Sequence, residues 1–323
     1  MARKIAIVMS GGGAKGAFQV GVLDELITRR GVTVDIFAGV STGAIQALAG
    51  AQNDIPGLLG QWLALRGNGD VYSEKPLGIV GGFLGASSLY DPRAIRDRIR
   101  AFADEAKLRA TGKTLLLGTV NLQTGLFRSI RENTPGIADW VYASAAQPPF
   151  FPPLTTRDAQ GREEQWVDGG VRNVTPLSDA LAQNPRAVLV IMASPLTPPA
   201  ATTRQYTAIV PIALRSVSIL SSEVMQNDTE QATLINDLLV ARAAQARALA
   251  DAGVTGTQAK AVLAPLDAQL ARYRFAPIRI LAPPREFSDT LEFDPAKIRA
   301  AIEAGRKAVA DDWPAIQALI ATP

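Results

Sequence analysis

Short apolar runs alternate with segments of helical periodicity in the first fifty residues. Residues 4–10 (KIAIVMS) form a β-branched run that predicts a strand buried on both faces. Residues 17–29 carry apolar side chains at helical spacing, residues 34–40 predict a second strand, and residues 42–50 predict a helix of small side chains. Strands that alternate with helices in this way predict an α/β sheet.

The rest of the chain contains further strand patterns and two stretches without a regular pattern. Apolar runs predict strands at residues 114–120, 125–130, 165–167, 187–193 and 277–282, the second being the hairpin partner of the first. We expect loops at residues 67–90 and at residues 143–153, because the latter stretch is rich in proline.

Two Asp-Pro pairs predict where helices begin. We expect Asp91 and Asp294 as N-cap residues, with the following prolines at the first helical position, which needs no N–H donor. Residues 203–275 are rich in Ala, Leu and Gln and predict helices, after a proline-rich loop at residues 195–200. We expect one domain over residues 1–323, with residues 203–275 as a helical insertion or cap within it.

The composition excludes several kinds of site. The chain has 323 residues, no cysteine and no histidine. Disulfides, zinc-thiolate sites, cysteine nucleophiles, histidine-ligated metals and a Ser-His-Asp triad are therefore excluded. The net charge is only +3, and no dense basic tract occurs, so nucleic-acid binding has no support.

The apolar segments are too short to predict a membrane-spanning helix. The N-terminus lacks a signal-peptide pattern, and no apolar stretch reaches the roughly 18–20 residues of a spanning helix. We expect a cytoplasmic protein with peripheral contact at a membrane surface. Residues 76–90 are uncharged and are one candidate for that contact, although packing inside the protein is the alternative we favour. The candidate side chains are Leu77, Ile79, Val80, Phe83 and Leu84.

A serine stands at the end of the second predicted strand. Residues 39–43 (GVSTG) have the G-x-S-x-G form of a nucleophile elbow around Ser41. A serine on such a sharp turn has strained backbone angles, and larger side chains at Gly39 and Gly43 would collide. A plain small-residue turn between strand and helix is the alternative for this motif taken alone.

A glycine loop follows the first predicted strand. Gly11, Gly12, Gly13 and Gly16, with Lys15 among them, match G-x-G-x-x-G between a strand and a helix. This pattern is typical of dinucleotide binding, and Asp35 lies near the spacing of a ribose-binding acid. The other interpretation is an oxyanion hole made of glycine amides. A nucleophile elbow only about 25 residues later favours the oxyanion hole, because a dinucleotide-binding unit does not require it.

A serine nucleophile needs a proton acceptor, and here it cannot be histidine. The chain has 30 acidic residues, and spacing alone does not choose among them. Asp168 ends a short predicted strand and precedes Gly169 and Gly170, but an ordinary Asp-Gly turn would have the same pattern.

Three motifs occur in a fixed order: GGGAKG from Gly11, GVSTG from Gly39 and DGG from Asp168. Together with ASAAQPPFFPP from residue 143 and the positions of Asn173 and Pro176, they resemble the patatin-like phospholipase family. The resemblance covers at least residues 4–195 and resumes at residue 277, where the last helix contains Gly305. Residues 203–275 depart from the family core.

The resemblance implies a three-layer α/β/α domain around a mainly parallel sheet, with no metal and no cofactor. It implies hydrolysis of fatty acyl esters in phospholipids or simpler lipids by a dyad of Ser41 and Asp168. The amides of Gly11, Gly12 and Gly13 would form the oxyanion hole, and Lys15 occupies a position that is basic in the family. The alternatives are a dinucleotide-dependent enzyme using residues 11–16, a non-catalytic lipid-binding module, and a transacylase or thioesterase with the same dyad.

Overall fold

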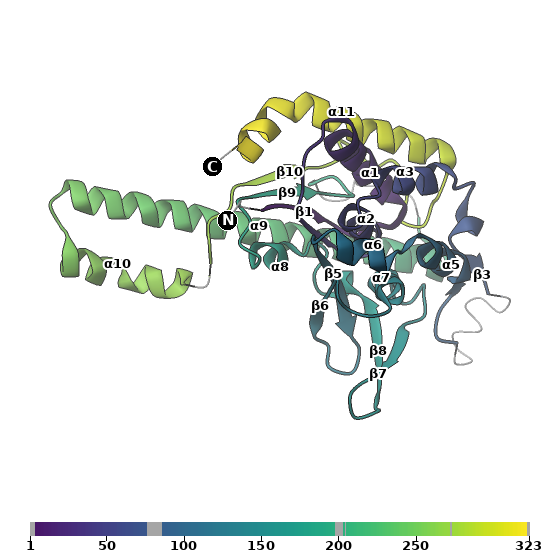
Figure 1. Cartoon of the computed structure of the whole chain (residues 1–323). Coiled ribbons are helices and arrows are strands. Elements are labelled where there is room, and N and C mark those ends of the chain that lie inside the picture. Colours follow the sequence, from purple (N-terminus) through teal and green to yellow (C-terminus); the bar gives the residue numbers. More distant parts are fainter. Residues whose placement is uncertain (1–3, 76–85, 198–202, 204, 272, 322–323) are drawn as a thin grey trace.

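One mixed sheet organises the fold (Figure 1). The computed structural model describes residues 4–75, 86–197, 203, 205–271 and 273–321. The strand order is β10-β9-β1-β2-β5-β8-β7, and β6 pairs with β5. The parallel strands are β1 (Ile5–Met9), β2 (Ile36–Gly39), β5 (Thr114–Asn121), β9 (Ala187–Ile191) and β10 (Ile278–Leu281). The antiparallel strands are β6 (Phe127–Arg131), β7 (Leu154–Arg157) and β8 (Glu163–Asp168).

Helices cover both faces of this sheet. One face is covered by α1 (Ala17–Leu23), α2 (Thr42–Ala51), α3 (Ile55–Leu63), α7 (Ile137–Ala145) and α11 (Pro295–Ala321). The other face is covered by α8 (Leu177–Leu181) and the middle of α9 (Ile209–Asp251). The remaining helices are α5 (Arg93–Phe102), α6 (Glu105–Ala110) and α10 (Gly256–Leu270). The predicted α/β/α architecture with a mainly parallel sheet is therefore confirmed.

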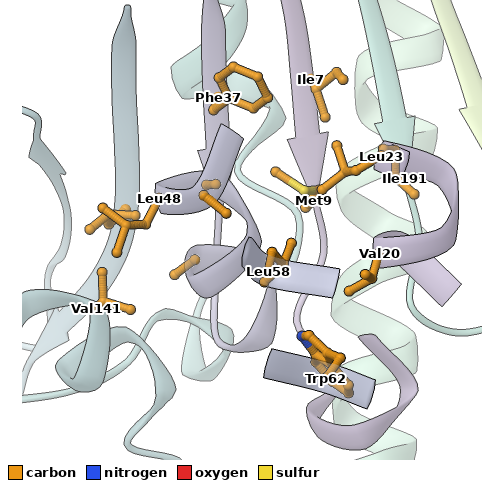
Figure 2. Packing of buried hydrophobic residues seen from close by; sticks show 14 of the residues in the cluster. Ile7, Met9, Val20, Leu23, Phe37, Leu48, Leu58, Trp62, Val141 and Ile191 are labelled. Carbon is orange, nitrogen blue, oxygen red and sulfur yellow. The ribbon is translucent and has the colours of Figure 1, made fainter. Parts of the chain in front are cut away.

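The alternation of side chains along the strands produces two apolar cores. In β1, Ile7 and Met9 enter the core under α1, α2 and α11, whereas Ala6 and Val8 enter the core under α8 and α9. Figure 2 shows Ile7, Met9 and Phe37 on the first of these faces. Burial on both faces explains why the central strands read as continuous apolar runs.

The expected helical insertion consists mainly of α9 and α10. Helix α9 has 43 residues, and its Met225 and Ala232 lie in the second core. Its later part projects beyond the sheet, with α10 folded back beside it (green in Figure 1). The Arg242 guanidinium of α9 donates hydrogen bonds of 2.6 and 2.8 Å to the Asp267 carboxylate of α10.

One of the two predicted helix starts needs a correction. Helix α11 begins at Pro295 as predicted, and Asp294 Oδ1 accepts the Ala296 and Lys297 N–H groups at 2.8 and 2.9 Å. Helix α5 instead begins at Arg93, one residue later than expected, because Asp91 belongs to β4 and pairs with Ser73. Pro92 is the residue before the helix rather than its first residue.

The loop predictions were partly wrong. Residues 67–90 contain the short strands β3 (Ser73–Glu74) and β4 (Tyr90–Asp91), which pair with each other. The first residues of the stretch 143–153 complete α7, because the prolines that end the helix come only afterwards. The candidate lipid contacts Leu77, Ile79, Val80, Phe83 and Leu84 lie outside the described residues.

Candidate active site

Ser41 lies on the turn between β2 and α2, and its backbone has φ 58° and ψ −127°. A positive φ is rare for a residue with a side chain and marks a strained turn. The turn is also crowded, since a Cβ on Gly39 would lie 2.0 Å from the Gly43 carbonyl oxygen. A Cβ on Gly43 would lie 2.4 Å from the Met9 carbonyl oxygen. Glycine at both positions therefore allows the turn that presents Ser41 beyond the sheet.

A second serine holds this turn. The Ser41 N–H donates to the Ser144 hydroxyl at 3.1 Å, and that hydroxyl donates to the Gly118 carbonyl at 2.6 Å. Ser144 is fully buried on α7, and Gly118 belongs to β5. Sequence reasoning did not identify Ser144, because its partners are far away in the chain.

Asp168 is the last residue of β8 and is fully buried. Its Oδ1 accepts the Gly170 N–H at 2.7 Å, and its Oδ2 has no hydrogen-bond partner among the described residues. Burial raises the pKa of Asp168 to about 7, although the Gly170 N–H and the nearby Ser41 hydroxyl oppose the shift. The structure thus brings Ser41 and Asp168 together, from positions 127 residues apart in the sequence.

The glycine loop follows β1 and passes beside Ser41, since a Cβ on Gly11 would lie 3.1 Å from Ser41 Cβ. The Gly11 N–H donates to the Val174 carbonyl at 3.0 Å. This amide already has an acceptor in the protein, and its place in an oxyanion hole stays a prediction. The Gly12 and Gly13 N–H groups have no protein acceptor in the part of the chain that the structure describes.

The end of the glycine loop is fixed by its contacts. Gly13 has φ 57°, and a Cβ there would lie 2.1 Å from the Thr290 carbonyl oxygen. The Gly16 carbonyl accepts the Gln46 side-chain amide at 3.0 Å, which ties the loop to α2. Lys15 is buried, and its Nζ lies 2.9 Å from the Glu286 carboxylate. The basic side chain is thus paired with an acidic residue 271 positions later in the chain.

The family model for patatin-like phospholipase matches residues 7–181, which include the glycine loop, Ser41 and Asp168. The chain belongs to the patatin-like phospholipase family. No curated protein matches the chain. Among solved structures, it is similar to VipD from Legionella pneumophila, with a TM-score of 0.43 and 17% identity. That match covers 96% of this chain, which spans 66% of the length of the VipD chain.

Membership of the patatin-like phospholipase family supports hydrolysis of lipid acyl esters in general. The position of Asp35 argues against the competing interpretation, in which this acid would bind the ribose of a dinucleotide at the glycine loop. Asp35 precedes β2, whereas the glycine loop follows β1, and the two strands are parallel, so the two features lie at opposite ends of the sheet. The Asp35 carboxylate instead accepts the Ile5 N–H at 3.0 Å.

A cavity of about 170 Å³ joins Ser41, Asp168 and the glycine loop. Most of its wall is apolar and comes from α2, α3 and α5 and from the loops that hold Phe150 and Phe293. Its apolar lining includes Leu48, Leu58, Trp62, Ile99, Phe150 and Phe293. Such a wall suits an acyl chain, as expected for a patatin-like phospholipase.

Neither a metal-binding cluster nor a membrane-spanning helix occurs within the described ranges. No cluster of three or more acidic side chains in them could hold a metal ion. None of the helices described is both long enough and apolar enough to span a bilayer.

Proposed function

We propose that this protein is a serine hydrolase of lipid acyl esters, with Ser41 as nucleophile and Asp168 as general base. The observation that carries the proposal is the burial of Asp168 and its effect on the pKa of the carboxyl group. Asp168 is fully buried at the cavity that contains Ser41, one of its carboxylate oxygens has no partner among the described residues, and burial raises its pKa to about 7. A base with a pKa near the working pH is suited to accept a serine proton.

The first half of the reaction transfers the acyl group to the enzyme. Asp168 takes the proton of the Ser41 hydroxyl while Oγ attacks the ester carbonyl carbon, and the carbonyl oxygen becomes an oxyanion. When the tetrahedral intermediate collapses, its bond to the alcohol oxygen breaks. Asp168 returns the proton to the leaving alcohol, and the acyl group remains on Ser41.

The second half releases the fatty acid. Water attacks the acyl-enzyme carbonyl and gives one proton to Asp168, which then returns it to Ser41 Oγ as the acyl–oxygen bond breaks. The same carboxyl group therefore acts as base and acid in each half. No histidine is needed at any step, which agrees with a chain that contains none.

The amides of Gly12 and Gly13 are the donors we assign to the oxyanion. Both follow β1 and line the cavity that contains Ser41, and both lack a protein acceptor among the described residues. Amides held in place by a rigid loop stabilise developing charge without reorganisation. The start of α2, directly after Ser41, adds the positive end of a helix dipole.

The apolar cavity supports a fatty acyl chain as the part of the substrate that is bound. We propose acyl lipids, phospholipids included, as the substrate class, and no metal or cofactor takes part in the steps above. Peripheral contact with a membrane stays a prediction.

The test compares the wild type with Ser41→Ala and Asp168→Asn on a short p-nitrophenyl ester and on mixed phospholipid vesicles. We expect both variants to fold and to lose activity, whereas Asp179→Asn, a half-buried carboxylate of α8 outside the cavity lining, keeps it. Full activity of Asp168→Asn would show that another group is the base. An inactive wild type that also fails to react with a fluorophosphonate at Ser41 would overturn the proposal.

A further inference from the structure

The helical insertion contacts the loop that follows Asp168. Asp228 of α9 accepts the Val174 N–H at 3.2 Å and the Thr175 N–H at 3.1 Å, both on Oδ2. Both of these loop residues are buried. Asp228 lies outside residues 7–181, the part of the chain that matches the family.

Val174 connects this contact to both halves of the site. Its carbonyl accepts the Gly11 N–H at 3.0 Å, which fixes the start of the glycine loop. Its methyl groups lie 3.8 Å from where a Cβ on Gly11 would stand and 3.7 Å from where a Cβ on Gly170 would stand. The Gly170 N–H in turn donates to Asp168 Oδ1 at 2.7 Å. A shift of Val174 would therefore reach the glycine loop and Asp168 together.

The same helix also forms part of the cavity wall. Leu214, Val217, Ser218, Ser221, Ser222 and Met225 of α9 line the cavity that contains Ser41. Asp228 follows Met225 by three residues and is about one helical turn farther along α9. Helix α9 thus contributes a wall to the site and, through Asp228, an acceptor for the loop behind it.

We propose that Asp228 is a positioning residue of the active site, which makes the helical insertion a working part of the catalytic apparatus. Its carboxylate holds Val174, and Val174 sets the glycine loop and the Asp168 turn relative to Ser41. The inference rests on the proposed function. Among the described residues of the cavity wall, Asp228 forms a hydrogen bond only with Val174, so its loss acts mainly on kcat rather than on KM.

The test uses three substitutions at this position in the full chain. Asp228→Asn keeps an oxygen at the site of Oδ2 but loses the charge, Asp228→Glu keeps the charge but moves it by one methylene, and Asp228→Ala removes the acceptor. The matched control is Asn236→Ala, which removes another tie between α9 and the core, the 2.8 Å bond from the Asn236 amide to the Ala276 carbonyl. Active enzyme is titrated with a fluorophosphonate, and kcat and KM are measured on a soluble p-nitrophenyl ester.

We expect kcat per titrated site to fall about ten-fold to about a hundred-fold in Asp228→Ala and in Asp228→Glu, with KM unchanged. Asp228→Asn should remain closer to the wild type, and Asn236→Ala should lower only the melting temperature. If Asp228→Ala does not fold, the kcat values of Asp228→Asn and Asp228→Glu still test the inference. Equal kcat in the wild type and Asp228→Glu, or a lower kcat in Asn than in Glu, would overturn the inference while leaving the Ser41–Asp168 proposal intact. An inactive wild type would instead overturn that proposal, and the inference with it.

Discussion

The Ser144 hydroxyl accepts a hydrogen bond from the Ser41 N–H at 3.1 Å and thereby ties the strained serine turn to helix α7. Because the same hydroxyl donates to the Gly118 carbonyl at 2.6 Å, α7 joins the turn to β5. The positive φ of Ser41 is unfavourable by itself and persists only where surrounding contacts fix it.

We therefore predict that Ser144→Ala lowers both stability and activity. The substitution leaves the Ser41 N–H and the Gly118 carbonyl without their partner, which costs about 1–3 kcal/mol. Urea unfolding and kcat on a soluble ester measure the two effects. Thr119→Val is the matched control, since it also removes a buried hydroxyl. The Thr119 hydroxyl, on β5, donates to the Arg128 carbonyl at 3.1 Å. The control variant should lose stability but keep kcat, and equal kcat values for both variants would contradict the role of Ser144.

A second prediction concerns the pH dependence of the reaction. Asp168 must be ionised to act as a base, and burial raises its pKa to about 7, so kcat/KM should rise with pH and level off above about pH 8. No histidine contributes a limb in this range, because the chain contains none. Rates on a soluble ester between pH 4 and pH 9 measure the midpoint.

Asp228 provides the control for this profile, because burial raises its pKa to about 6. If Asp168 is the titrating base, Asp228→Asn keeps the limb near pH 7 even where its kcat differs. If the limb near pH 7 disappears in Asp228→Asn, the titrating group is Asp228 and not Asp168. That result would contradict the prediction.

The sequence indicated the candidate catalytic residues more readily than the residues that hold them in place. Ser41 and the glycine loop each follow a strand of the sheet, Asp168 ends one, and local motifs marked all three. Ser144 and Asp228 act through bonds to residues 103 and 54 positions away, and their immediate neighbours in sequence carry no signal of those partners. The bond from the Gly11 amide was not foreseen for the same reason, because its acceptor Val174 is distant in the chain.

The raised pKa of Asp168 also predicts how stability depends on pH. The native state binds this proton more tightly than the unfolded chain, whose aspartates titrate near 3.8, so a rise from about pH 4 to about pH 7 lowers the free energy of unfolding. Asp168→Asn lacks this proton linkage. Its stability relative to the wild type should therefore increase over that window, by up to roughly 4 kcal/mol, since one pKa unit corresponds to about 1.4 kcal/mol.

Thermal unfolding of both proteins at several pH values measures this difference. Asp267→Asn is a control of opposite sign, because the hydrogen bonds from Arg242 lower the pKa of this exposed carboxylate. That carboxylate stabilises the fold above about pH 4. Asp267→Asn should therefore lower the stability at neutral pH and have no effect on stability in acid. A difference between Asp168→Asn and the wild type that does not change from pH 4 to pH 8 would mean that Asp168 titrates normally.

The last prediction compares Gly39, which the turn at Ser41 requires, with Gly60, which lies outside that turn. Gly39→Ala would place a Cβ 2.0 Å from the Gly43 carbonyl oxygen, and backbone on both sides of Ser41 would have to move. We expect a loss of about 1–3 kcal/mol or more and the loss of activity, because the nucleophile leaves its position. Gly60→Ala is the matched control, since Gly60 is exposed on α3 and no heavy atom lies within 4 Å of its added Cβ. That substitution should stabilise the fold by about 0.5–1 kcal/mol through helix propensity and leave kcat unchanged. If Gly39→Ala instead keeps both its stability and its reaction with a fluorophosphonate, the turn at Ser41 is more tolerant than its contacts indicate, and backbone strain is not what presents the nucleophile.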